Sequence, residues 1–120
     1  WLCPHKHYAT GNRSFLRDPP TPDAKDESGP YQMYVDIGAY GFPRAVRDKK
    51  PFEMTPTMRA LEKYVLERDG FQMLYADTFQ TKEEFERMFN HSHYNAMRAK
   101  YNAESAFGVV YDKMALRHSG

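Results

Sequence analysis

Residues 71–89 read FQMLYADTFQTKEEFERMF and carry two successive patterns that indicate an α+β architecture. From Phe71 to Phe79 the side chains alternate with the period of a β-strand. Thr81 and Glu84 then form a capping box, in which each side chain binds the backbone N–H of the other residue. The sequence therefore predicts a strand over 71–79, followed by a helix whose inward residues are Phe85, Met88 and Phe89.

A second alternating segment and a second helix precede this region. Residues 31–40, YQMYVDIGAY, predict a strand, and the opening WLCP resembles the middle of another one. The next helix is predicted over 56–69, because Thr55 is a good N-cap, Pro56 suits the first helical position and Gly70 ends the pattern.

Two further helices are predicted towards the end of the chain. One follows a break at residues 90–92, and the last lies near 106–117 with Phe107 among its inward residues. The first of these helices is expected to turn inward Tyr94, Met97 and Tyr101. The order is strand, loop, strand, helix, strand and three helices, which is an α+β arrangement.

The composition excludes several classes of protein. The 120 residues carry a formal net charge of +1, whereas a simple nucleic-acid-binding domain would be strongly basic. No apolar run approaches the roughly 18 residues of a membrane-spanning helix. Phe, Tyr and Trp together number 18 and Leu, Ile and Val only 12, so we expect an aromatic core with surfaces suited to flat ligands or to another domain.

Residues 9–30 hold four of the eight prolines and are predicted to form a long surface loop, interpreted as a tolerated insertion. The chain opens on WLCP, an apolar tetrad without an initiator Met. We therefore expect it to be a fragment of a longer protein.

No metal or nucleophile motif stands out. The pairs His5-x-His7 and His91-x-His93 lack a third ligand at a fixed spacing, and are interpreted as polar surface histidines. Cys3 is expected to be a buried, inert thiol. The sequence contains neither G-x-S-x-G nor G-x-G-x-x-G, so no nucleotide-phosphate site can be built from these residues alone.

Two aspartates are candidate site residues because each stands inside an otherwise apolar or aromatic predicted strand. Asp36 lies two residues after Tyr34, and Asp77 two residues after Tyr75. A buried carboxylate needs a hydrogen-bond partner, and a Tyr–Asp pair on a sheet face can donate a proton or orient a substrate. The alternative is that each aspartate caps a turn or pairs with an arginine, and the residues leave both interpretations open.

Five strings resemble, in order and spacing, the C-terminal end of the Δ24-sterol reductase family, which comprises the 24-dehydrocholesterol reductase and Diminuto/Dwarf proteins. They are WLCP (1–4), YVDIGAYGFPR (34–44), LEKYV (61–65), GFQMLYADTFQTKEEFERMF (70–89) and AFGVVYDK (106–113). The resemblance covers about two thirds of the chain and fails over 5–30.

The resemblance implies a flavoenzyme of the vanillyl-alcohol-oxidase type. Residues 1–120 would then be a C-terminal fragment of its cap or substrate domain, with an antiparallel sheet flanked by helices, and the FAD-binding domain and an N-terminal membrane anchor would lie outside them. Such enzymes use FAD and NADPH to reduce a sterol side-chain double bond in the endoplasmic reticulum membrane. The fragment alone would be soluble and inactive, with the FAD-binding domain of the same protein and the sterol as its partners.

The resemblance also directs the choice of site residues. Related oxidases place a C-terminal strand against the flavin, and GFQMLYAD is similar to that strand, although their His-Trp-x-Lys motif is missing here. We predict Tyr75 and Asp77 as catalytic residues, Gln72, Tyr34 and Asp36 as substrate- or flavin-facing residues, and no metal ligand. The alternative function is a non-catalytic interaction or lipid-binding module that kept the cap fold.

Overall fold

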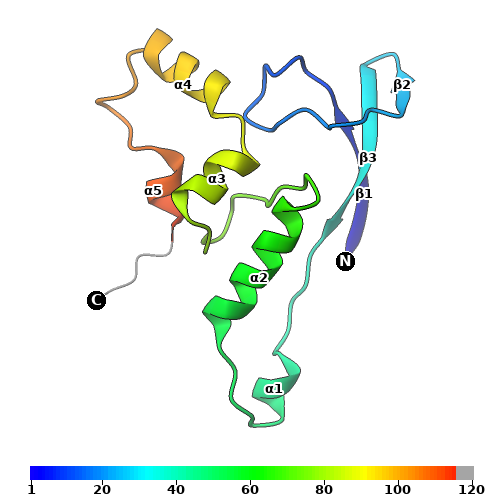
Figure 1. The fold of residues 1–120 in the computed structure, drawn as a ribbon, viewed down its shortest axis with the longest axis vertical. Coiled ribbons are helices and arrows are strands. Elements are labelled where there is room, and N and C mark those ends of the chain that lie inside the picture. Colours follow the sequence, from blue (N-terminus) through cyan, green and yellow to red (C-terminus); the bar gives the residue numbers. More distant parts are fainter. Residues whose placement is uncertain (116–120) are drawn as a thin grey trace.

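The computed structural model describes residues 1–115 and shows an α+β fold, as predicted (Figure 1). A three-stranded antiparallel sheet lies on one side of the molecule and the helices on the other. The elements are β1 (Leu2–Tyr8), β2 (Ala24–Asp26), β3 (Gly29–Ile37), α1 (Arg44–Arg47), α2 (Met54–Leu66), α3 (Lys82–Met88), α4 (His91–Lys100) and α5 (Val110–Met114).

The sheet has the order β1-β3-β2, so the predicted strands at the chain start and at 31–40 are confirmed and pair with each other. The second strand ends at Ile37, however, and residues 38–40 lie outside it. Their register runs from Leu2 opposite Ile37 to Tyr8 opposite Tyr31. Because strand side chains alternate, the sheet has one face towards the helices and one face away from them. The outward face carries exposed apolar side chains, here called the bare sheet face: Leu2, Met33, Val35 and Ile37.

The prediction of a surface loop over 9–30 is wrong for the last residues, which form strands. It is also wrong for Phe15, whose side chain packs against the core. Residues 24–26 form β2, and Gly29 already belongs to β3, because the Asp26 carboxylate accepts the Ser28 N–H and closes a tight hairpin. The irregular part is not wholly on the surface, since the ring of Phe15 stacks on a core phenylalanine.

The predicted strand over 71–79 is wrong. This segment is irregular apart from one isolated bridge at Thr78. Side chains of α2 take the place of a neighbouring strand: the Phe79 N–H donates to Glu62 at 2.8 Å, and Arg59 donates to the Phe79 carbonyl. The backbone N–H and C=O of Phe79 thus bind side chains of α2 instead of the backbone of a neighbouring strand.

The helix predicted over 56–69 is confirmed with shifted ends. Helix α2 begins after Glu53, not after Thr55, and ends at Leu66. Pro56 therefore occupies the third helical position, where the missing N–H is again one that has no partner within the helix. The N–H of Gly70 closes the following turn by donating to the Val65 carbonyl.

The capping box is confirmed. Thr81 Oγ1 accepts from the Glu84 N–H at 3.2 Å, and Glu84 Oε2 accepts from the Thr81 N–H at 2.7 Å, directly before α3. The fully buried apolar residues of the described chain are the three that the pattern placed inward, Phe85, Met88 and Phe89.

Three predictions near the chain end and one at its start need correction. Tyr101 lies at the C-cap of α4 with 70% of its surface exposed, and Phe107 precedes α5 and is also exposed. The helix predicted near 106–117 spans only Val110–Met114, and its final residues lie outside the described part of the chain. Cys3 is exposed, because its side of β1 is not covered at that point.

The fold is open for its length. The Cα radius of gyration is 17.0 Å, whereas a compact 120-residue domain has one of about 14 Å. The core is confined to the helical side, and the bare sheet face stays uncovered. These dimensions indicate apolar surface that remains available for contact with another body.

Candidate functional site

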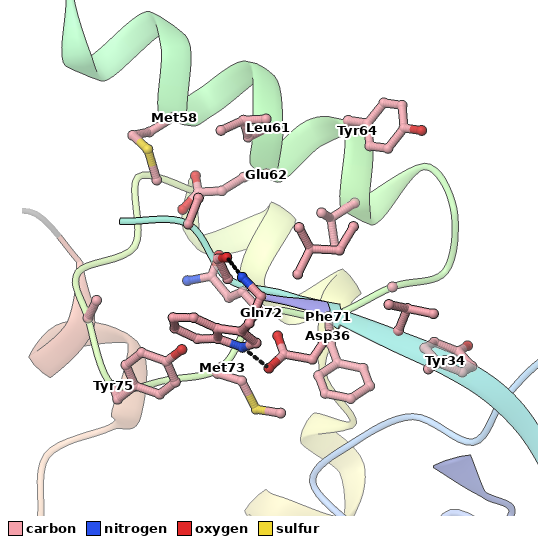
Figure 2. A pocket seen from close by; sticks show the side chains of 18 of the residues that line it. Tyr34, Asp36, Met58, Leu61, Glu62, Tyr64, Phe71, Gln72, Met73 and Tyr75 are labelled. Atoms are coloured by element: carbon pink, nitrogen blue, oxygen red, sulfur yellow. Dashed lines mark hydrogen bonds between the residues drawn. The ribbon is translucent and has the colours of Figure 1, made fainter. Parts of the chain in front are cut away.

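A hollow of about 570 Å³ lies between β3, α2 and residues 70–77 (Figure 2). Helix α2 contributes Met58, Leu61 and Tyr64 to one wall, and Phe71 and Met73 contribute to the opposite wall. The lining is mostly apolar and aromatic. A cavity of this size and character suits a small organic ligand.

All five residues predicted for the site line this hollow: Tyr34, Asp36, Gln72, Tyr75 and Asp77. Two come from β3 and three from the irregular segment that follows α2, about 40 residues later in the sequence. The structure therefore brings the set together in space. Their chemical roles stay a prediction.

The two β3 residues are held by hydrogen bonds. The indole N–H of Trp1 donates to Asp36 Oδ2 at 3.3 Å, so the partner of Asp36 is an indole and not an arginine (Figure 2). The Tyr34 hydroxyl donates to the Asp69 carbonyl at 3.2 Å. Burial, with a smaller contribution from the charge of Asp69, raises the pKa of Tyr34.

The three loop residues differ in how firmly they are held. Gln72 accepts a hydrogen bond from Gln80 at 2.7 Å and is thereby tied to the core segment. Tyr75 is 71% exposed, and Asp77 makes no hydrogen bond or ion pair within residues 1–115. Both side chains are free to meet a ligand.

The sequence analysis missed Glu62, which also lines the hollow (Figure 2). Only 7% of its surface is exposed, and its Oε1 accepts from the Thr78 hydroxyl at 3.1 Å and from the Phe79 N–H. Burial raises the pKa of Glu62, and these two hydrogen bonds partly oppose that rise. The signal was present, since Glu62 stands four residues after Met58 and three before Val65, on the apolar face of α2.

A comparison with curated proteins shows what this chain is similar to. It is 42% identical over 120 residues to the Delta(24)-sterol reductase of Homo sapiens, covering 98% of this chain and 20% of that protein. It is 34% identical to the Delta(24)-sterol reductase of Arabidopsis thaliana over 94% of this chain and 21% of that protein. The Caenorhabditis elegans homolog is 36% identical over 95% of this chain and 19% of its own length. The chain belongs to the Delta(24)-sterol reductase family.

The match extends over more of the chain than the five strings that first indicated it. This family member spans about one fifth of the length of the curated relatives it matches. Those relatives are named as reductases, which are oxidoreductases. No protein-family model and no solved structure matches the chain.

Three histidines of this Delta(24)-sterol reductase family member, His5, His7 and His91, contact aromatic rings. His7 is buried, its Nε2 lies 2.7 Å from the Arg17 carbonyl, and its ring packs edge-on against Tyr34. The prediction of polar surface histidines is therefore wrong for His7, because β1 turns it towards Phe71. Among the described residues, no three or more His, Cys, Asp or Glu side chains gather closely enough to hold a metal ion.

None of the helices within residues 1–115 is long and apolar enough to cross a membrane. The longest of them, α2, has 13 residues, whereas a span needs roughly 20.

Proposed function

We propose that this chain is the C-terminal, substrate-binding part of an FAD-dependent Delta(24)-sterol reductase. The whole enzyme would reduce a side-chain double bond of a sterol, with NADPH as reductant and the flavin as hydride carrier. The chain would belong to a cap domain of the vanillyl-alcohol-oxidase type. Family membership and the mostly apolar hollow both support this function.

The observation that carries the proposal is the meeting of five residues from two separate segments at one apolar hollow. A sterol is a flat hydrocarbon ring system, and its burial contributes about 25 cal/mol for each Å² of apolar area. Ligand cavities in proteins commonly enclose about 300–1,000 Å³, and the observed volume of about 570 Å³ falls in that range. The hollow would form one wall of the sterol site.

The residues of the hollow do not fit the diphosphate of FAD. Two aspartates, Asp36 and Asp77, share the hollow with Arg68, whose guanidinium is engaged over the ring of Tyr64. A phosphate site instead needs converging backbone N–H groups or free cations. FAD would therefore be held by an FAD-binding domain of the same protein, outside this chain, and the 120 residues alone would be inactive.

The bare sheet face would pack against that domain. Leu2, Met33, Val35 and Ile37 are more than half exposed, and contiguous apolar patches of this kind usually mark contact surfaces. The relatives are about five times longer than this chain, so the part of such a protein outside these 120 residues is large enough to cover the bare sheet face. Attachment to the endoplasmic reticulum membrane would come from an anchor in that remaining part.

Within the site, Tyr75 and Asp77 are proposed as the catalytic residues that orient the reacting end of the sterol. Gln72, Tyr34 and Asp36 would face the sterol or the flavin. Tyr75 and Asp77 are the least constrained of the five, whereas the other three are fixed by hydrogen bonds. The two side chains without hydrogen bonds can adjust to a bound ligand, whereas the three that are held by hydrogen bonds would form a fixed wall of the site.

The full-length enzyme tests this function. We expect it to purify yellow, to lose its flavin absorbance when NADPH is added without oxygen, and to regain it when a sterol with a side-chain double bond follows. A colourless protein that binds the sterol without converting it would instead support the second candidate, a lipid-binding module. The exposed apolar face and the hollow are the observations that favour that alternative.

A further inference from the structure

We propose that Glu62 is the acid that protonates the double bond, an inference that rests on the proposed reductase function. Reduction of an alkene needs a hydride on one carbon and a proton on the other. Glu62 combines three features of a proton donor: it lines the hollow, it is shielded from bulk water, and one of its oxygens is left without a partner.

The hydrogen bonds of Glu62 determine where its proton resides. Oε1 accepts from both the Thr78 hydroxyl and the Phe79 N–H, so a proton placed on Oε1 would compete with two donors. Oε2 is buried and has no hydrogen-bond partner among residues 1–115. The acid form of Glu62 therefore carries its proton on Oε2, the oxygen that no group of residues 1–115 engages. Because Oε2 has less than 1 Å² of accessible surface, the carboxyl must rotate towards the hollow to reach a ligand there.

The environment of Glu62 favours the neutral acid before the reaction. Burial is the largest effect on the pKa of Glu62 and raises it, and the nearby Glu84 of α3 raises it further. The charge of Arg59, one turn earlier on α2, acts in the opposite direction, as do Thr78 and Phe79. The net shift is upward, so the proton is retained to higher pH than on an exposed glutamate.

The proton-transfer step balances as follows. A hydride would have to reach one alkene carbon from a reduced cofactor held outside this chain. The other carbon would form a bond to the proton of Oε2 while the O–H bond breaks. The electron pair of that O–H bond stays on Glu62, and the resulting carboxylate is stabilised by the two hydrogen bonds to Oε1. A water-derived proton restores the acid after the product leaves.

Exposure within this chain distinguishes Glu62 from Tyr75, another residue of the hollow with an acidic O–H group. Tyr75 is 71% exposed, so no other part of residues 1–115 shields its hydroxyl from water. Glu62 is 7% exposed. Tyr75 thus keeps an orienting role.

The experiment separates the two half-reactions of the full-length enzyme in a stopped-flow spectrometer. Glu62→Gln keeps an oxygen to accept from Thr78 and Phe79 but has no acidic proton. We expect flavin reduction by NADPH at the wild-type rate and sterol-dependent flavin reoxidation slowed by about 100-fold or more, the usual contribution of a general acid. Glu67→Gln is the matched control, because Glu67 follows the same helix but is exposed and lies outside the hollow.

A second variant keeps the proposal testable if Glu62→Gln fails to fold. Thr78→Val removes one hydrogen bond that lowers the pKa of Glu62, so the fall in reoxidation rate at alkaline pH should move to higher pH. Wild-type reoxidation by Glu62→Gln, or an unmoved pH profile in Thr78→Val, would overturn the assignment of Glu62 alone. A wild-type enzyme whose flavin the sterol never reoxidises would overturn the proposed function, and this inference with it.

Discussion

Replacing Phe85 tests whether the small helical core holds the fold together. The Phe85 side chain is fully buried, and its ring lies among those of Phe89, Tyr111 and Phe15 at centroid distances of 4.8, 5.4 and 6.4 Å. Phe85→Ala removes the entire buried ring and leaves a cavity between helices that cannot fully close.

The expected loss follows from this complete burial. A fully buried Phe→Ala change lowers the free energy of unfolding by about 3–5 kcal/mol. Whole domains of this size have only about 5–15 kcal/mol in total. With a urea m-value of about 1–3 kcal/mol/M, the unfolding midpoint should fall by about 1 M or more.

The assay is urea unfolding of the 120-residue chain followed by far-ultraviolet circular dichroism. Tryptophan fluorescence is less suitable, because Trp1 is half exposed at the end of the sheet and does not contact the core. Phe107→Ala is the matched control. Its ring is 61% exposed, so it should change the unfolding free energy by no more than about 0.5 kcal/mol. Equal losses in the two variants would refute a fold held by the α3 core.

Three further outcomes are expected. The Asp26 carboxyl should titrate with a pKa of about 2 by NMR, chiefly because Lys6 binds it, and Lys6→Met should raise that pKa. The contribution of this carboxylate to the stability of the folded state is complete above the unfolded pKa of 3.8. It is lost as the pH falls towards 2. Thr81→Ala should lower the unfolding free energy by about 1 kcal/mol in the same urea assay, since it removes the cap on the Glu84 N–H. Tyr75→Phe in the full-length enzyme should slow sterol reduction without loss of bound flavin, and unchanged turnover would remove Tyr75 from the site.

Residues 71–79 show that side chains predicted for one site can line the same hollow even though the strand predicted to carry them does not form. In a strand, Gln72 would face away from Tyr75 and Asp77. In the irregular segment observed, all three line the hollow, because hydrogen bonds to α2 and to Gln80 replace the β-ladder. The residue types indicated a site, but their alternation did not describe its backbone.

The sequence by itself determined the features that depend on neighbours within about one helical turn or one strand. The β3 alternation, the helix α2 and the Thr81 capping box are of this kind. The family resemblance also came from the sequence, through strings spread along the chain. The tertiary structure alone decided which groups bind the carboxylate of Glu62 and that one of its oxygens has no partner among residues 1–115. It also decided that residues far apart in the chain enclose one hollow. The physical reason is that a local pattern fixes which backbone conformation is favourable, whereas the partner of each buried polar group depends on which distant segment packs against it.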